Sequence, residues 1–243
     1  MITALRSRAE LELDRLALDP YCRLYLPLWK LDGDSLADHS AYGHLCTNYG
    51  SFWTPQGRSF DGNDYVDCGN KPSLDITKAI TIEAWVKLPT GYTASHKMVV
   101  SKEGSAWYIS IYNNKVLFSA WIDGVQTLID GTKIVSGDIW HHVACSWDSA
   151  TGKYRTYLDA QIDVDTIHSG NSLSTNTKSL LLGSFEVPPD YSFNGLIDEV
   201  RIYNRALSPA EIVLLASPSF SPVVPVRRYI EGVITHIRGW WSK

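Results

Sequence analysis

The chain has 243 residues, of which 44% are hydrophobic and 12% aromatic, and its formal net charge is −4. This length is sufficient for one large domain with a buried core. The 22 basic residues are spread along the sequence, so they do not form the concentrated positive field that binds phosphate groups. We therefore expect no nucleic-acid partner.

Residues 1–23 predict an N-terminal helical arm. Leu5, Leu13 and Leu16 recur at helical spacing, and Pro20 follows the end of the pattern. Two interpretations remain open: the apolar stripe contacts a neighbouring subunit, or the helix folds back on its own domain.

Residues 24–216 predict a single all-β domain. Short apolar runs alternate with Gly, Asp, Asn, Ser and Pro, without intervening helical periodicity, which indicates strands joined by turns and packed as two sheets. Asn113 and Asn114 separate two aromatic-rich runs and predict a hairpin, because Asn tolerates positive φ. The predicted strands are 24–30, 58–61, 64–68, 79–88, 97–102, 106–112, 115–122, 139–147, 153–159, 178–184 and 194–204.

The C-terminal part predicts a closing helix, a linker and a second arm. Ser208 followed by Pro209 and Glu211 is typical of a helix start. The proline-rich residues 217–225 predict an extended linker. Residues 226–243 predict an amphipathic segment that contacts a partner protein; we do not expect membrane attachment, because its polar face is only modestly basic. Its apolar stripe consists of Ile230, Ile234, Ile237 and Trp241.

The four cysteines give no paired C-x-x-C motif, which argues against a zinc site or a dithiol redox site. We expect Cys22, Cys46, Cys68 and Cys145 to be reduced. The alternative is a disulfide between Cys22 and Cys46.

Several motifs occur in the order and spacing of one known family. Residues 59–66 read Ser-Phe-Asp-Gly-Asn-Asp-Tyr-Val and resemble the Phe-Asp-Gly-x-x-Asp-Tyr-Val signature of laminin-G-like, concanavalin A-like lectin domains. The resemblance implies a jelly-roll sandwich of two antiparallel sheets that serves in adhesion, carbohydrate recognition or assembly. Both predicted arms lie outside it. The motifs that continue the resemblance are 80–86, 140–144, 157–159, 180–183 and 193–208.

The same resemblance implies a structural calcium ion. In similar folds the Asp of the Ile-Asp-Glu-Val-Arg motif, here Asp198, meets oxygen ligands where the chain enters the sandwich, here near Asp32 and Asp34. Asp61 and Asp64 are further candidates, because calcium takes about six to eight oxygen ligands. The alternative is that these carboxylates only form Asx turns.

Aromatic residues suggest a carbohydrate-binding surface. Tyr108 and Tyr112 share one face of a predicted strand, Trp121 lies on a compatible face of the next strand, and Trp53 and Tyr191 fall in predicted loops. Sugars stack their apolar faces on such rings while nearby polar groups bind the hydroxyls. The alternative for the strand aromatics is packing in the core.

Glycosidase chemistry has little support in the sequence. It requires two carboxylates directed at one sugar, and the best spaced pair, Asp163 and Asp165, lacks an accompanying Glu. We therefore expect no catalytic activity.

Two functional interpretations remain. The chain starts at Met without an apolar export signal or a stretch long enough to span a membrane, and it carries two arms. We therefore expect a virion structural protein, such as a phage decoration or fibre-associated subunit whose arms dock on neighbouring subunits. The alternative is a calcium-dependent, carbohydrate-binding adhesin or lectin-like module. The expected location is the virion or an extracellular surface.

Overall fold

The computed structural model describes most of the predicted domain, namely residues 19–28, 35–54, 56–92, 95–102, 104–187 and 191–217. The partner-contact residues predicted for the two arms lie outside the described residues, as do Asp32 and Asp34. Those arm residues are Leu5, Leu13, Leu16, Ile230, Ile234, Ile237 and Trp241.

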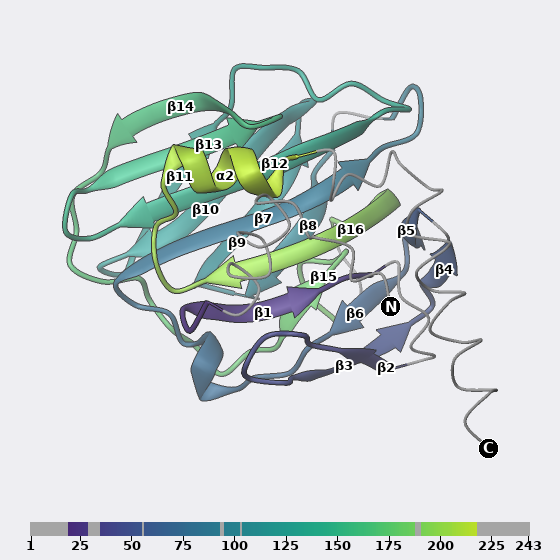
Figure 1. Cartoon of the computed structure of the whole chain (residues 1–243), viewed down its shortest axis with the longest axis horizontal. Helices are drawn as coiled ribbons and strands as arrows, with labels where there is room; N and C mark the ends of the chain where they lie inside the picture. The colour runs from purple at the N-terminus through teal and green to yellow at the C-terminus, as the bar shows by residue number, and fades with distance from the viewer. Residues whose placement is uncertain are drawn as a thin grey trace, which may run out of the picture.

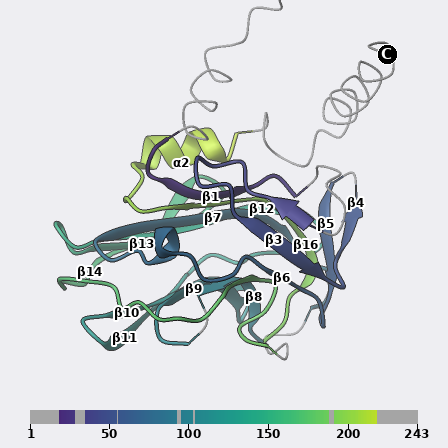
Figure 2. The same ribbon diagram turned by 90° about the horizontal axis from the view of Figure 1, so that it is seen from below.

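The described strands form two eight-stranded antiparallel sheets that pack face to face (Figures 1 and 2). This confirms the predicted sandwich. Sheet A has the order β14-β13-β12-β7-β16-β5-β4, with β1 also paired to β16, and sheet B has the order β11-β10-β9-β8-β15-β6-β3-β2. The bounds in sheet A are β1 (Cys22–Leu26), β4 (Phe52–Thr54), β5 (Gly57–Asp61), β7 (Ala79–Lys87), β12 (Trp140–Asp148), β13 (Lys153–Leu158), β14 (Gln161–Ile167) and β16 (Asn194–Tyr203). The bounds in sheet B are β2 (Ser35–Ala37), β3 (Leu45–Tyr49), β6 (Tyr65–Asp67), β8 (Lys97–Lys102), β9 (Trp107–Tyr112), β10 (Lys115–Ile122), β11 (Val125–Asp130) and β15 (Leu180–Leu182).

The main core lies between the two sheets and follows the two-residue alternation of the strands. On β12, Val143, Cys145 and Trp147 belong to this core. The strands that the sequence did not predict, β2, β3, β4, β11 and β14, are short or polar. β2, β3 and β4 are too short to show a clear apolar alternation. β14 alternates Ile162 and Val164 with Asp163 and Asp165, but it is a largely exposed edge strand.

Local turn and capping chemistry agrees with the predictions. Asn113 and Asn114 have φ of +48° and +61° and connect β9 to β10, where Tyr112 pairs with Lys115. The closing helix α2 (Pro209–Leu215) begins with a capping box between Ser208 and Glu211. Within the described residues, no helix has the length and apolarity to cross a bilayer.

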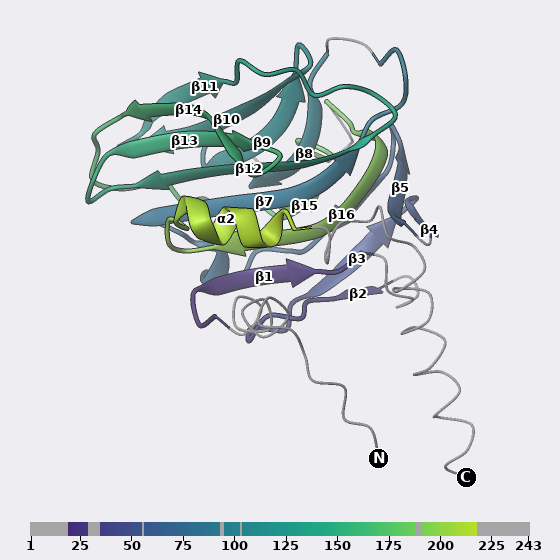
Figure 3. The same ribbon diagram turned by 45° about the horizontal axis from the view of Figure 1, so that its top comes forward.

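Helix α2 covers part of the outer face of sheet A, on the side away from β9–β11 (Figures 2 and 3). Its Ile212 and Leu215 join a small buried cluster with Tyr157 of β13 and Tyr203 of β16. The outer face of sheet B lies on the opposite side of the sandwich from this helix.

A buried ion network lies on the same outer face of sheet A. Arg201 Nη1 donates to Glu83 Oε1 at 2.7 Å, and its Nη2 donates to Glu199 Oε2 at 2.6 Å. The Tyr25 hydroxyl donates to the same Glu199 oxygen at 2.9 Å, and His142 Nε2 lies 3.0 Å from Glu83 Oε2. The network therefore joins β1, β7, β12 and β16.

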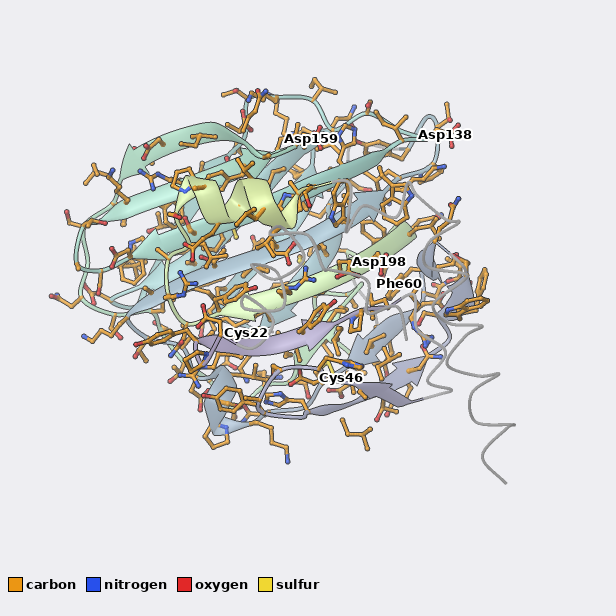
Figure 4. All side chains as sticks on the ribbon, viewed as in Figure 1. Cys22, Cys46, Phe60, Asp138, Asp159 and Asp198 are labelled. Carbon is orange, nitrogen blue, oxygen red and sulfur yellow. A yellow bond between two sulfur atoms is a disulfide. The ribbon has the colours of Figure 1, made fainter. Side chains whose placement is uncertain are left out.

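The cysteine prediction is wrong. Cys46 and Cys68 form a disulfide with a Cα–Cα distance of 4.0 Å, while Cys22 and Cys145 are buried free thiols. Thr47 of β3 pairs with Asp67 of the antiparallel strand β6, so Cys46, which precedes Thr47, faces Cys68, which follows Asp67. Figure 4 labels Cys46 on β3 and Cys22 on the separate strand β1. Because β3 was not predicted, this register was not visible in the sequence.

Candidate binding face

The outer face of sheet B carries an aromatic platform, which we define as Tyr108, Tyr112, Trp121, Phe185, Tyr191 and His96. Tyr108 pairs with Ser119 across β9 and β10, which makes Trp121, two residues further, its diagonal neighbour on the same face. The Tyr108 and Trp121 ring centroids are 6.4 Å apart. Three of the predicted sugar-binding residues therefore lie on one face.

Two connecting segments bring further rings onto this face. Phe185 and Tyr191 follow β15, and His96 precedes β8. Phe185 meets Tyr108 edge-on with centroids 5.6 Å apart, and Tyr191 lies 6.0 Å from Phe185. His96 stacks on Tyr112 at 4.1 Å and meets Tyr191 at 5.1 Å. Ring contacts thus link all six members of the platform.

A small apolar base supports the platform. Met98, Tyr108 and Leu117 form a buried cluster that is separate from the core between the sheets, and Tyr112, Trp121 and Phe185 pack on it while remaining partly exposed. The backbone N–H of Met98 donates to the Tyr191 carbonyl at 2.9 Å, which holds the loop against β8. This packing places the aromatic rings side by side in the chain without a ligand.

Polar groups lie beside the rings. Gln126 of β11 is exposed and donates through Nε2 to Ser119 Oγ at 3.2 Å. Burial raises the pKa of Tyr108, although hydrogen bonds with Ser119 and Gln126 oppose the shift. Burial lowers the pKa of His96, and nearby Asp130 partly offsets that effect. At neutral pH the platform is therefore uncharged, with amide and hydroxyl groups at its edge.

The structure separates the predicted sugar-binding residues into two groups. Tyr108, Tyr112, Trp121 and Tyr191 come together, whereas Trp53 lies on β4 at the edge of sheet A. Tyr108 is only 7% exposed, so it supports the platform more than it presents a surface. The sequence did not single out Phe185 or His96, because both lie in connecting segments whose approach depends on the fold.

The predicted calcium ligands do not meet at one place within the described residues. Asp61 and Asp64 share the turn after β5, where Asp64 Oδ2 accepts from the Asp61 N–H at 2.9 Å. Asp198 lies on β16 (Figure 4) beside Gly57, at the other end of β5. Four residue-to-residue steps along the strand separate these ends by about 13 Å.

A calcium site around Asp198 alone would need oxygen ligands from elsewhere. No group of three or more His, Cys, Asp or Glu side chains that suits a metal ion occurs in the described part of the chain. Asp198 is fully buried, and its Oδ1 accepts from the Glu199 N–H at 2.9 Å. Since Asp32 and Asp34 are outside the described residues, calcium binding stays a prediction.

The carboxylates on the described strands of the outer face of sheet B are far apart. Asp130 on β11 and Asp67 on β6 are five strand spacings from each other, or about 24 Å, whereas paired glycosidase carboxylates lie about 5–10 Å apart. Asp163 and Asp165 are already engaged: Asp163 accepts from Thr132 and Lys133, and Asp165 pairs with Arg155.

Two Asp-His-Ser hydrogen-bond chains tie turns to strands. His44 lies between Asp38 and Ser73, with distances of 2.6 and 2.7 Å, and Asp38 also accepts from the Tyr25 backbone N–H. His141 bridges Asp159 and Ser136 in the same way, at 2.8 and 2.9 Å. The ring of the adjacent His142 lies on the other face of β12 and bonds to Glu83, while the His142 backbone N–H donates to Asp159 at 3.0 Å.

Comparison with known proteins places this fold in one family. Residues 60–213 match a laminin-G-type family model described as the concanavalin A-like lectin/glucanases superfamily. A mouse protein with sushi, von Willebrand factor type A, EGF and pentraxin domains is 29% identical over 155 residues. That match covers 59% of this chain and 4% of the mouse protein.

Two solved structures share the fold. One is domain 4 of AbnA, an extracellular arabinanase from Geobacillus stearothermophilus, in complex with arabinotriose; it is 20% identical, with a TM-score of 0.61, and the match covers 81% of this chain and 98% of that one. The other is the binding domain of botulinum neurotoxin DC in complex with rat synaptotagmin II, at 14% identity and a TM-score of 0.60, covering 82% and 52%. At these identities the likeness concerns the fold alone. Since the family model matches more than half of the sequence, the chain belongs to the concanavalin A-like lectin/glucanases superfamily.

Proposed function

We propose that this domain is a non-catalytic carbohydrate-binding module that holds its ligand on the aromatic platform of sheet B. The observation that carries the proposal is the linked set of rings in which Tyr112 and Trp121 are partly exposed and Tyr191 is 49% exposed. Rings that are fixed by packing, with one side open and hydroxyl and amide groups beside them, match what a sugar needs.

The charge of this face favours a neutral ligand. The outward positions on β9, β10 and β11 are mainly aromatic, apolar or uncharged polar residues. Lys115 and Asp130 are the charged ones at these outward positions, and they lie on β10 and β11 respectively. A sulfated or sialylated glycan would need a concentrated positive field, which these two opposite charges do not provide. The arabinotriose complex of a similarly folded domain makes a neutral oligosaccharide a suitable first probe.

The proposal is tested by affinity electrophoresis of the full chain in gels that contain soluble arabinan, xylan, β-glucan, galactomannan or galactan. We expect at least one polymer to retard the chain, and Trp121→Ala to remove about 90% of that affinity, because stacked rings contribute on the order of 1.5 kcal/mol. The matched control is Trp140→Ala, which removes a half-buried indole from sheet A.

Retardation by none of the five polymers, or equal loss in both variants, would overturn the proposal. Repeating the run with calcium and with chelator tests the predicted ion separately. Loss of binding in chelator would link the predicted calcium ion to carbohydrate recognition.

The virion interpretation rests on the two arms, which lie outside the described residues, and no observation on the described residues favours it. It stays a prediction. Receptor binding, as in the synaptotagmin complex, would appear as binding to a protein that Trp121→Ala does not weaken.

A further inference from the structure

A second pair of aromatic rings lies on the same outer face of sheet B, away from the platform. Tyr49 of β3 and Tyr65 of β6 are directly paired across the two strands. Their rings stack with centroids 4.5 Å apart and an interplanar angle of 12°. Tyr49 is 46% exposed, so a substantial part of this pair faces solvent.

The strand register shows that the pair and the platform share one face. One row of paired residues crosses the sheet from Thr47 through Asp67, Leu181, Ser101 and Tyr108 to Ser119. Tyr49 and Tyr65 are two residues from Thr47 and Asp67, and side chains two residues apart point to the same side of a strand. The pair therefore points to the same side of the sheet as Tyr108.

The segment after β15 separates the two groups of rings. Ser101 Oγ donates to the Phe185 carbonyl at 3.1 Å, so this segment lies over the middle of the row. Leu181 and Ser101 are fully buried beneath it. The face thus presents two aromatic areas with a ridge between them and not one continuous platform.

A disulfide supports the two strands that carry the pair. The Cys46–Cys68 disulfide joins β3 to the end of β6 on the inner side of the same two strands. Exposed Thr47 and half-buried Asp67 lie next to the rings on the outer side. A stacked tyrosine pair with a hydroxyl and a carboxylate beside it offers an apolar surface and hydrogen-bonding groups together.

We infer that Tyr49 and Tyr65 form a second carbohydrate subsite, so that the domain binds polymeric glycans at two points on one face. This inference rests on the proposed function of the platform. From β10 to β6 there are four strand spacings, or about 19 Å, so the two subsites contact separate parts of one polymer chain. Two linked contacts strengthen binding by avidity, whereas a short oligosaccharide reaches one of them.

The test compares one polymer that retards the full chain with the trisaccharide of the same sugar, using isothermal titration calorimetry. We expect Tyr49→Ala to weaken binding to the polymer by about tenfold or more and to change trisaccharide affinity less than twofold. Trp121→Ala should weaken both. Tyr21→Ala is the matched control, because Tyr21 is 51% exposed and precedes β1 of sheet A.

The outcomes separate the two proposals. If Trp121→Ala weakens both ligands and Tyr49→Ala weakens neither, the second subsite is wrong and the platform stands. If Tyr49→Ala weakens the trisaccharide as much as the polymer, the two-point model is wrong. If Trp121→Ala has no effect on either ligand, the proposed carbohydrate-binding function of the platform is wrong. Circular dichroism of Tyr49→Phe and Tyr49→Ala checks that the strand pair stays folded.

Discussion

The two outer faces of the sandwich differ in how deeply their charged and aromatic side chains are buried. On sheet A, the side chains of Arg201, Glu83 and Glu199 are at most 2% exposed and form ion pairs with one another. On sheet B, the outward rings of Tyr112, Trp121 and Tyr191 remain partly or largely exposed. A face that excludes water must pair its charges, while a face that keeps contact with water can leave apolar rings open for a ligand.

We expect the two outer faces to have different roles. Removing a partner from a buried ion network leaves an uncompensated charge, which destabilises the fold strongly. Removing an exposed aromatic ring changes the free energy of unfolding only slightly. We therefore expect substitutions on sheet A to act on stability and substitutions on the platform to act on binding.

The largest expected effect is that of Arg201→Met, which leaves two buried carboxylates without their common partner. We expect the free energy of unfolding to fall by about 3–5 kcal/mol, measured by urea unfolding. The control is Lys87→Met, because Lys87 pairs at 3.4 Å with an Asp138 side chain that is 72% exposed, and exposed ion pairs contribute about 0–1 kcal/mol. An equal loss of unfolding free energy in the two variants would show that the buried network is no more important for stability than the exposed ion pair.

Next in size is the disulfide of sheet B. Replacing Cys46 and Cys68 together by Ala should lower the free energy of unfolding by about 3 kcal/mol, because the bridge closes a loop with a sequence separation of 22. Alkylation of the denatured, unreduced chain should label Cys22 and Cys145 only. Labelling of all four cysteines would contradict the bridge.

A smaller effect is expected on the platform. Tyr191→Ala should change the free energy of unfolding by no more than about 1 kcal/mol, while weakening polymer binding in the electrophoresis assay. Far-ultraviolet circular dichroism and urea unfolding provide the stability measurement. A loss as large as that of Arg201→Met would show that the platform is part of the structural core.

The smallest effect concerns His96 and pH. Its pKa in the folded chain lies below its ordinary value of 6.5 because burial disfavours the charged ring. Above pH 6.5 the ring is neutral in both states; as pH falls below this value the unfolded chain takes up the proton first, so stability decreases until the folded pKa is passed.

NMR titration of the His96 ring should give a pKa below 6.5. The slope of stability against pH in this range should flatten in His96→Gln. A pKa above the ordinary value would mean that Asp130 outweighs burial at this edge of the platform.

Much of the fold could be predicted from local patterns. The strands from β7 to β10, the Asn113–Asn114 hairpin and the capped helix α2 each depend on a few neighbouring residues, through alternation, turn conformation and capping. Three of the five predicted sugar-binding residues share the strand pair β9–β10 and could be placed on one face for the same reason.

Pairing between distant segments decided the rest. Alternation along β16 would place Asp198 and Arg201 on opposite faces. A bulge between them, with Glu199 at φ +52°, instead lets Asp198 pair opposite Trp85 and Arg201 opposite Glu83, on one side of β7. The bulge adds one residue to β16 relative to β7. No local sequence signal marks it, because the pairing with β7 determines the register.

The amino-acid sequence by itself determined the sandwich, its hairpins and the aromatic character of β9 and β10, because those features depend on contacts within a few residues. Only the tertiary structure decided that Cys46 meets Cys68, that Arg201 meets a Glu83 118 residues away, and that Phe185 and His96 complete the platform. These contacts require strand register and loop placement, which arise when the two sheets bury their common core.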